Sequence, residues 1–384
     1  MAVAIACAVA AYAVTVGAEK RRYPGIAASV PAPPASSSTR VDPKWPFVGA
    51  YTGPGAKGVE RLRDWEAWSG VRTRFALDFA PADSWTLIEG GDWQLAPWAD
   101  SGRRLIYSVP LFPKAQGNLS ECAAGDYDGH WSALARNLVE HRLADTVVRP
   151  GWEFNGNWYG WASAGQESAY VACFRHVVDA MRAVYGQHFA FLWNPVLGTE
   201  FSAAEPAYPG DGYIDFVGID VYDTSWVRGT YPVAADTSAE RRAAVREAVW
   251  STILDGSRGL RYWMRYAAAH GKRPVIPEWG LSERTDGHGG GDNPYFIERM
   301  LAFLADPANR PAFAMYFEAE APLSGGLNEH RMALDPPVFP LAAARFRRLV
   351  ASTDSADFGS DADRRQPPRS AGYGRFTRNV ALTS

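Results

Sequence analysis

The sequence predicts an α/β fold, a closed (β/α)₈ TIM barrel that forms a single catalytic domain. Short runs rich in β-branched and aromatic residues alternate with longer helical stretches, and eight such runs are each followed by a segment of helix length. The chain of 384 residues is 47% hydrophobic, which is enough for one large core. A doubly wound open sheet is the main alternative, but no glycine-rich turn follows the first strand as a dinucleotide site requires.

The expected strands are apolar runs bounded by polar, Gly or Pro residues. In chain order they cover residues 47–51, 73–79, 103–112, 145–154, 188–195, 214–222, 273–280 and 312–320. The helical stretches repeat apolar residues at intervals of three and four. They include residues 131–144, 168–186, 239–271 and 293–305. Asp292 or Asn293, just before Pro294, is expected to begin the last of these helices.

The two ends of the chain differ from the barrel in composition. Residues 1–22 resemble a secretory signal peptide with a small-residue cleavage pattern, so we expect a secreted protein, with an outward-facing membrane anchor as the alternative. Residues 23–44 are rich in Pro, Ala and Ser and predict a flexible linker. The barrel is expected over residues 45–352. Residues 353–384 mix charge, Pro and Gly and predict a disordered or loosely docked tail.

Charge and aromatic content indicate the class of partner. The formal net charge is −3 and 21% of residues are charged, which argues against nucleic acid or an anionic membrane as a ligand. The chain is 13% aromatic, and flat rings stack on the apolar faces of sugars, so a polysaccharide or oligosaccharide is the expected partner. No obligate protein partner is expected, and we expect a monomer.

The cysteine and histidine patterns indicate no catalytic or metal-binding site. Cys122 and Cys173 permit one disulfide but do not require it. The histidines show no metal-ligand spacing, so neither a metal nor another cofactor is expected.

Two glutamates end strands that face each other across the predicted barrel mouth. Glu153 ends the fourth strand and Glu278 ends the seventh. Two carboxyls so placed can flank a glycosidic bond, one as proton donor and the other as nucleophile. The alternatives are a solvated loop acid or an Arg149 ion pair for Glu153, and a strand-end capping acid for Glu278. Tyr222 ends the sixth strand, where its hydroxyl can donate to the nucleophile.

The pattern around Glu153 resembles glycoside hydrolase family 26, the retaining β-mannanases and related endo-β-glycanases. It has the form R-x-G-x-E-x-N-G-x-W between Arg149 and Trp158, and the resemblance continues at 191–195, 215–223 and 273–280. It covers the chain from about residue 45 to 350. The resemblance implies a retaining endo-acting glycosidase whose best substrate guess is a β-1,4-mannan.

The resemblance also implies roles for individual residues. Glu153 would be the acid/base, Glu278 the nucleophile and Tyr222 the hydroxyl that orients it. The rings expected to line sugar subsites are Trp158, Trp161 and Trp193. One position departs from the family, because Trp152 stands where a His usually precedes the acid/base. Indole donates one hydrogen bond and accepts none, so recognition of the sugar 2-hydroxyl must differ.

Further candidates for substrate binding are less specific. They are Trp152, Asn155, Asn194, Trp279, Glu318 and Glu320. For the two asparagines and the two acids, the alternative is a hydrogen bond that supports the fold. Two other functions also stay open, namely hydrolysis of a bacterial envelope or exopolysaccharide, and carbohydrate binding by a barrel that does no chemistry.

Overall fold

The computed structural model describes residues 45, 48–198, 202–234, 236–309, 311–323 and 326–352. The predicted signal peptide or anchor, the predicted linker and the predicted tail all lie outside the described residues.

The parallel strands close into a barrel. β1 pairs with β2 on one side and with β10 on the other, and β10 also pairs with β8, which completes the ring. The strands are β1 (Val48–Tyr51), β2 (Phe75–Phe79), β3 (Arg104–Val109), β4 (Val147–Pro150), β5 (Ala190–Trp193), β6 (Phe216–Gly218), β7 (Val221–Tyr222), β8 (Arg273–Gly280) and β10 (Ala314–Phe317). This closure excludes the open doubly wound sheet and confirms the (β/α)₈ barrel.

The sixth barrel strand is built from two pieces. Both β6 and β7 pair in parallel with β8, through Phe216 opposite Arg273 and Val221 opposite Trp279. β7 therefore extends the sixth strand towards the carboxyl end of the barrel. Tyr222, its last residue, lies beside the end of β8, where Glu278 is found.

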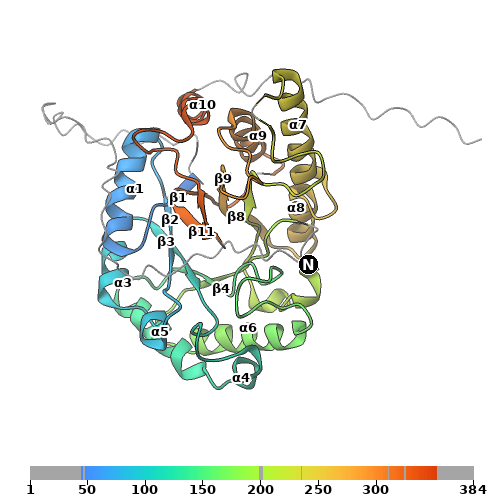
Figure 1. Ribbon diagram of the computed structural model, residues 1–384. Helices are drawn as coiled ribbons and strands as arrows, with labels where there is room; N and C mark the ends of the chain where they lie inside the picture. Colours follow the sequence, from blue (N-terminus) through green and yellow to red (C-terminus); the bar gives the residue numbers. More distant parts are fainter. Residues whose placement is uncertain are drawn as a thin grey trace, which may run out of the picture.

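Helices surround the strands as a ring (Figure 1). They are α1 (Gly55–Ser69), α2 (Trp85–Ile88), α3 (Asp92–Ala99), α4 (Leu119–Ala124), α5 (Asp128–Glu140), α6 (Glu167–Arg182), α7 (Ala239–Asp255), α8 (Leu260–Ala269), α9 (Pro294–Ala305) and α10 (Pro340–Ala351). α6 shows why they pack there, because its buried residues recur at intervals of three and four and form one apolar stripe. None of the helices in the described part of the chain is both long and apolar enough to cross a membrane.

Two helix predictions can be compared with the structure. The stretch 239–271 forms two helices, α7 and α8, because the segment from Gly256 to Gly259 interrupts it. Asn293 begins α9, since its side chain accepts the backbone N–H of Phe296 and Pro294 occupies the first helical turn.

The structure adds one feature that the sequence did not predict, a second sheet, and settles one that the sequence left open, the disulfide. A small antiparallel sheet joins β9 (Glu283–Arg284), β11 (Glu320–Leu323) and β12 (Gly326–Glu329), and Figure 1 shows β9 and β11 in front of the barrel strands. Cys122 and Cys173 form a disulfide that links α4 to α6.

Candidate active site

Glu153 lies in a turn rather than in a strand. β4 ends at Pro150, four residues before the predicted limit, and both Gly151 and Glu153 then adopt positive φ angles of 54° and 51°. A glutamate in this left-handed region is strained by about 1–2 kcal/mol. The turn holds it there, because the Glu153 N–H donates to the carbonyl of Asn194 at 2.7 Å and the Glu153 carbonyl accepts from Gly156 at 2.9 Å.

The Glu153 carboxyl is suited to carry a proton. It is 3% exposed, and burial together with the nearby charge of Glu278 raises its pKa from 4.5 to about 8. Arg149 and a hydrogen bond from the indole of Trp158, 3.0 Å from Oε2, act in the opposite direction. At neutral pH the side chain is therefore a neutral acid with a proton to donate.

Glu278 meets two donors, one on each carboxylate oxygen. Arg149 Nη1 donates to Oε1 at 2.6 Å, and the Tyr222 hydroxyl donates to Oε2 at 2.5 Å. Burial and the charge of Glu278 raise the pKa of Tyr222 well above its ordinary value, so its hydroxyl keeps the proton that it donates. A cation and a hydroxyl donor thus hold the two oxygens of Glu278 by short hydrogen bonds, which fix its orientation.

Arg149 anchors this arrangement from inside the barrel. It is fully buried, and its guanidinium also pairs with Asp220 and donates to Ser108 Oγ at 3.0 Å and to Asn194 Oδ1 at 2.9 Å. The sequence suggested an ion pair with Glu153, but Arg149 contacts Glu278 instead. Asp220 and Ser108 were not singled out from sequence, although a charged residue inside an apolar strand pattern, as in IDFVGIDVY, is a usable signal.

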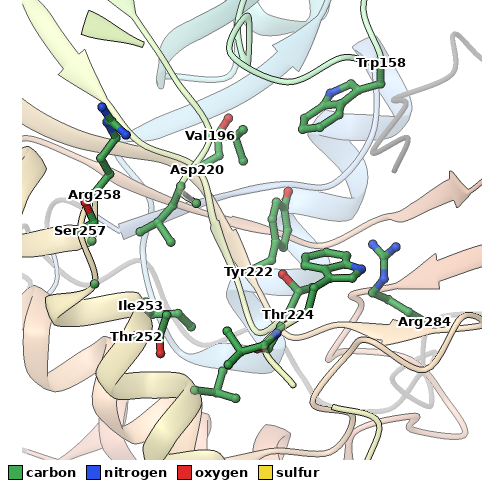
Figure 2. Close-up of a pocket in the computed structure, with 18 residues that line it drawn as sticks. Trp158, Val196, Asp220, Tyr222, Thr224, Thr252, Ile253, Ser257, Arg258 and Arg284 are labelled. Atoms are coloured by element: carbon green, nitrogen blue, oxygen red, sulfur yellow. The ribbon is translucent and has the colours of Figure 1, made fainter. Parts of the chain in front are cut away.

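Two cavities meet at Trp158, the residue that donates to Glu153. The β1–β4 cavity, of about 860 Å³, lies over the ends of the first four strands, and eight aromatic residues contribute to its lining. The β5–β7 cavity, of about 380 Å³, lies between the ends of β5 and β7 and helix α7. In Figure 2 the Trp158 ring and the Tyr222 hydroxyl face the same open space.

Trp152 belongs to an aromatic cluster beside Glu153. Its ring lies 5.0 Å from that of Tyr159, 5.1 Å from Trp161 and 5.4 Å from Phe79, measured between centroids. Its indole N–H donates to the Tyr159 hydroxyl at 3.0 Å, while the Trp161 indole donates to the Trp152 carbonyl. Trp152 and Trp161 line the β1–β4 cavity, and the Trp152 N–H already has a partner.

Two of the expected sugar-binding tryptophans lie elsewhere. Trp193 is fully buried, donates to the carbonyl of Ala207 and packs against Trp263 of α8. Trp279 is fully buried against Tyr316 and Phe296. Side chains alternate along a strand. Since Asn194 and Glu278 reach Arg149, their neighbours Trp193 and Trp279 face the helices, and they line neither cavity.

The two asparagines are engaged within the protein. Asn155 exchanges two hydrogen bonds with the backbone of Val196, and Asn194 binds Arg149 and Asp220. These bonds support the loops that carry the site.

The two acids that follow β10, Glu318 and Glu320, also have partners within the protein. The Glu318 carboxylate accepts the N–H groups of Met332 and Ala333, and burial raises its pKa to about 8. Glu320 pairs with Arg331. Among the described residues, no cluster of His, Cys, Asp and Glu side chains has the arrangement of a metal site.

Comparison with known proteins points to one family. The profile of glycosyl hydrolase family 26 matches residues 129–248, the segment that contains Glu153, Trp158 and Tyr222. A mannan endo-1,4-β-mannosidase of Bifidobacterium adolescentis is 25% identical over 256 residues, or 62% of this chain and 23% of that protein. Endoglucanase H of Acetivibrio thermocellus is 29% identical over 116 residues, or 28% of this chain and 12% of that protein. The chain thus spans less than a quarter of these relatives' length.

Solved structures show the same fold. A modular endo-β-1,4-mannanase from Cellulomonas fimi aligns with a TM-score of 0.56 at 19% identity, covering 81% of this chain and 71% of that one. A ruminal endo-β-1,4-mannanase of glycoside hydrolase family 26 aligns with a TM-score of 0.52 at 13% identity, covering 81% and 64%.

Proposed function

We propose that this chain is a member of glycosyl hydrolase family 26 and hydrolyses O-glycosidic bonds of a β-linked polysaccharide with retention of configuration. The observation that carries the proposal is the contrast between two buried carboxyls. Glu153 has its pKa raised to about 8, whereas Glu278 is clasped by Arg149 and Tyr222. A carboxyl that holds its proton, beside a second one positioned by a cation and a hydroxyl donor, is the arrangement that a proton donor and a nucleophile require.

The first step forms a covalent intermediate. The Glu278 carboxylate attacks the anomeric carbon while Glu153 gives its proton to the glycosidic oxygen, so the bond to the leaving sugar breaks as the ester bond to Glu278 forms. In the second step Glu153, now ionised, takes a proton from water, and the resulting nucleophile displaces Glu278. At the end of the cycle Glu153 is protonated and Glu278 ionised, as at the start. The anomeric carbon has been inverted twice, so its configuration is retained.

A β-1,4-mannan is the substrate that the named relatives support best. Trp152 weighs against a mannan-specific contact, because its one indole N–H is bonded to Tyr159 and it has no acceptor for a sugar hydroxyl. The cavities on either side of Trp158 suit a polymer bound across the catalytic pair, and hence internal cleavage.

We propose that the enzyme is exported and acts as a monomer without a cofactor. The disulfide between Cys122 and Cys173 supports an oxidising location.

The test is hydrolysis by the wild type, Glu153→Ala and Glu278→Ala on soluble mannans, glucans and xylans, with reducing ends as the readout. Loss of the acid/base should lower kcat by about 10²–10⁴ and loss of the nucleophile by more. Glu320→Ala, which removes an acid that pairs with Arg331 and lines neither cavity, is the control and should keep near-native activity. Near-native activity of either catalytic variant contradicts the proposal, and binding without any hydrolysis favours a non-catalytic barrel.

A further inference from the structure

The lysines of the described chain are unevenly placed. They are Lys57, Lys114 and Lys272, and the first two line the β1–β4 cavity. Lys57 lies in the first turn of α1, and Lys114 follows β3, where its backbone N–H is fixed to the carbonyl of Ala82 at 2.8 Å. Two separate elements thus bring an exposed ammonium group to one cavity.

Neither ammonium group has a hydrogen-bond or ion-pair partner among the described residues. Arg61 adds a third cation to the lining, and Asp83 is the one acid that the described residues place there. This excess of positive charge occurs on a protein whose formal net charge is −3.

The β5–β7 cavity offers a contrast. Its Arg258 pairs with Glu205, and its Arg284 pairs with Asp286. Asp220, which also lines it, pairs with Arg149. The unpaired lysines are therefore a feature of the β1–β4 cavity and not of the whole cleft.

A neutral sugar chain can accept hydrogen bonds from these amines but offers no negative charge for them to pair with. A cleft whose walls carry charge of one sign concentrates ligands of the opposite sign, and Lys binds carboxylate, sulfate and phosphate groups as a point charge. The same cavity holds Trp158 and the half-exposed Trp93, rings on which a pyranose can stack.

We propose that the β1–β4 cavity binds an acidic polysaccharide, a β-linked chain whose sugars carry carboxylate or sulfate groups that pair with Lys57 and Lys114. The inference rests on the proposed function, because the bound chain is the one that Glu153 and Glu278 cleave. It narrows the substrate class from β-linked glycans in general to anionic ones.

The test compares chains that differ only in charge. Soluble β-1,4-mannan and β-1,4-glucan are used unmodified, oxidised at C6 to the carboxylate, and sulfated, so that the last two arms separate the sources of negative charge. Wild type, Lys57→Met/Lys114→Met and the control Lys272→Met/Arg142→Met are assayed at low and at 0.5 M salt. The control removes the same charge at the opposite end of the barrel, before β8 and β4.

The wild type should show kcat/KM about tenfold higher on an anionic chain than on its neutral parent, through KM. The preference should disappear in Lys57→Met/Lys114→Met and at high salt, and persist in the control. Equal or lower kcat/KM on both anionic chains overturns the inference while leaving the proposed hydrolysis intact. Loss of the preference in the control as well also overturns it.

Binding separates this inference from the catalytic proposal. If the wild type cleaves none of these chains, calorimetry with oxidised and sulfated fragments decides. Salt-sensitive binding that Lys57→Met/Lys114→Met loses supports the acidic ligand on a barrel without hydrolase activity. Absence of binding to every anionic fragment rejects it.

Discussion

The Tyr222 hydroxyl donates a hydrogen bond of 2.5 Å to Oε2 of Glu278. β7 and β8 are hydrogen-bonded neighbours in the barrel, with Tyr222 opposite Gly280, so backbone pairing fixes the separation of the two side chains. This hydrogen bond fixes one carboxylate oxygen of Glu278, and Arg149 fixes the other. The carboxylate that we propose as nucleophile is therefore positioned before any substrate arrives.

Removing that hydroxyl tests the positioning. Tyr222→Phe should lower kcat about 10- to 100-fold, the scale of one charge-assisted hydrogen bond in a buried site, with the melting temperature nearly unchanged. Tyr213→Phe, on a tyrosine of a short 3₁₀ turn outside both cavities, is the matched control and should keep wild-type kinetics. Wild-type kcat for Tyr222→Phe would show that the hydroxyl does not assist Glu278.

If Glu153 is the acid/base, its proton should set the alkaline limit of activity. With a pKa of about 8, kcat/KM should fall above that pH as the acid ionises. The Trp158 indole stabilises the ionised form, so Trp158→Phe should move the alkaline limb to higher pH. A pH profile of kcat/KM from pH 4 to 10 measures the alkaline limb in the wild type and in Trp158→Phe. An alkaline limb at the same pH in both proteins would contradict a hydrogen bond from Trp158 that stabilises ionised Glu153.

The same pKa makes a prediction about stability. In the folded protein the pKa is about 8, against an ordinary value of 4.5, so the folded state holds this proton more tightly than the unfolded state. The contribution of this proton to the stability of the folded state is complete below pH 4.5. It is lost as pH rises towards 8, at up to about 1.4 kcal/mol per pH unit. Glu153→Gln does not titrate. Its free energy of unfolding, measured in urea, should therefore increase relative to that of the wild type as pH rises from 5 to 8. A difference between the two proteins that does not change with pH would contradict the raised pKa of Glu153.

Arg149 should be the most costly of these residues to lose. Arg149→Met leaves Asp220 and Glu278 buried without their cation, which typically costs about 3–5 kcal/mol. Arg261→Met breaks an ion pair with Asp255 in which both side chains are about half exposed, and should cost under about 1 kcal/mol. Chemical denaturation compares the two variants. Similar losses in both would mean that the buried network contributes no more than a surface pair.

The barrel was predictable because its signals are local. Eight apolar runs separated by helix-length segments imply parallel strands, and the length of the chain suits one closed sheet. The end of β4 could not be predicted, because strand propensity continues through Trp152 and Phe154 while the backbone turns at Gly151. A positive φ at Glu153 cannot be inferred from residue type, since glutamate rarely adopts it.

The two carboxyls that we propose as catalytic could be picked out because each lies at or just after the end of a predicted strand, whereas two of the ring assignments do not fit the structure. The family resemblance implies a sugar subsite at Trp193, and Trp279 is a further candidate, but both rings are fully buried because the alternation of side chains along a strand turns them towards the helices. Arg149 as the clamp on Glu278 depends on contacts between strands distant in sequence, which no local pattern reveals.

The most direct test of the account is the stereochemistry of azide rescue on an activated dinitrophenyl β-glycoside, followed by NMR. In Glu278→Ala, azide takes the place of the nucleophile and should give the α-glycosyl azide. In Glu153→Ala, azide attacks the intermediate held on Glu278 and should give the β-glycosyl azide. The reverse pairing of products with variants, or rescue of neither, would contradict Glu278 as nucleophile and Glu153 as acid/base.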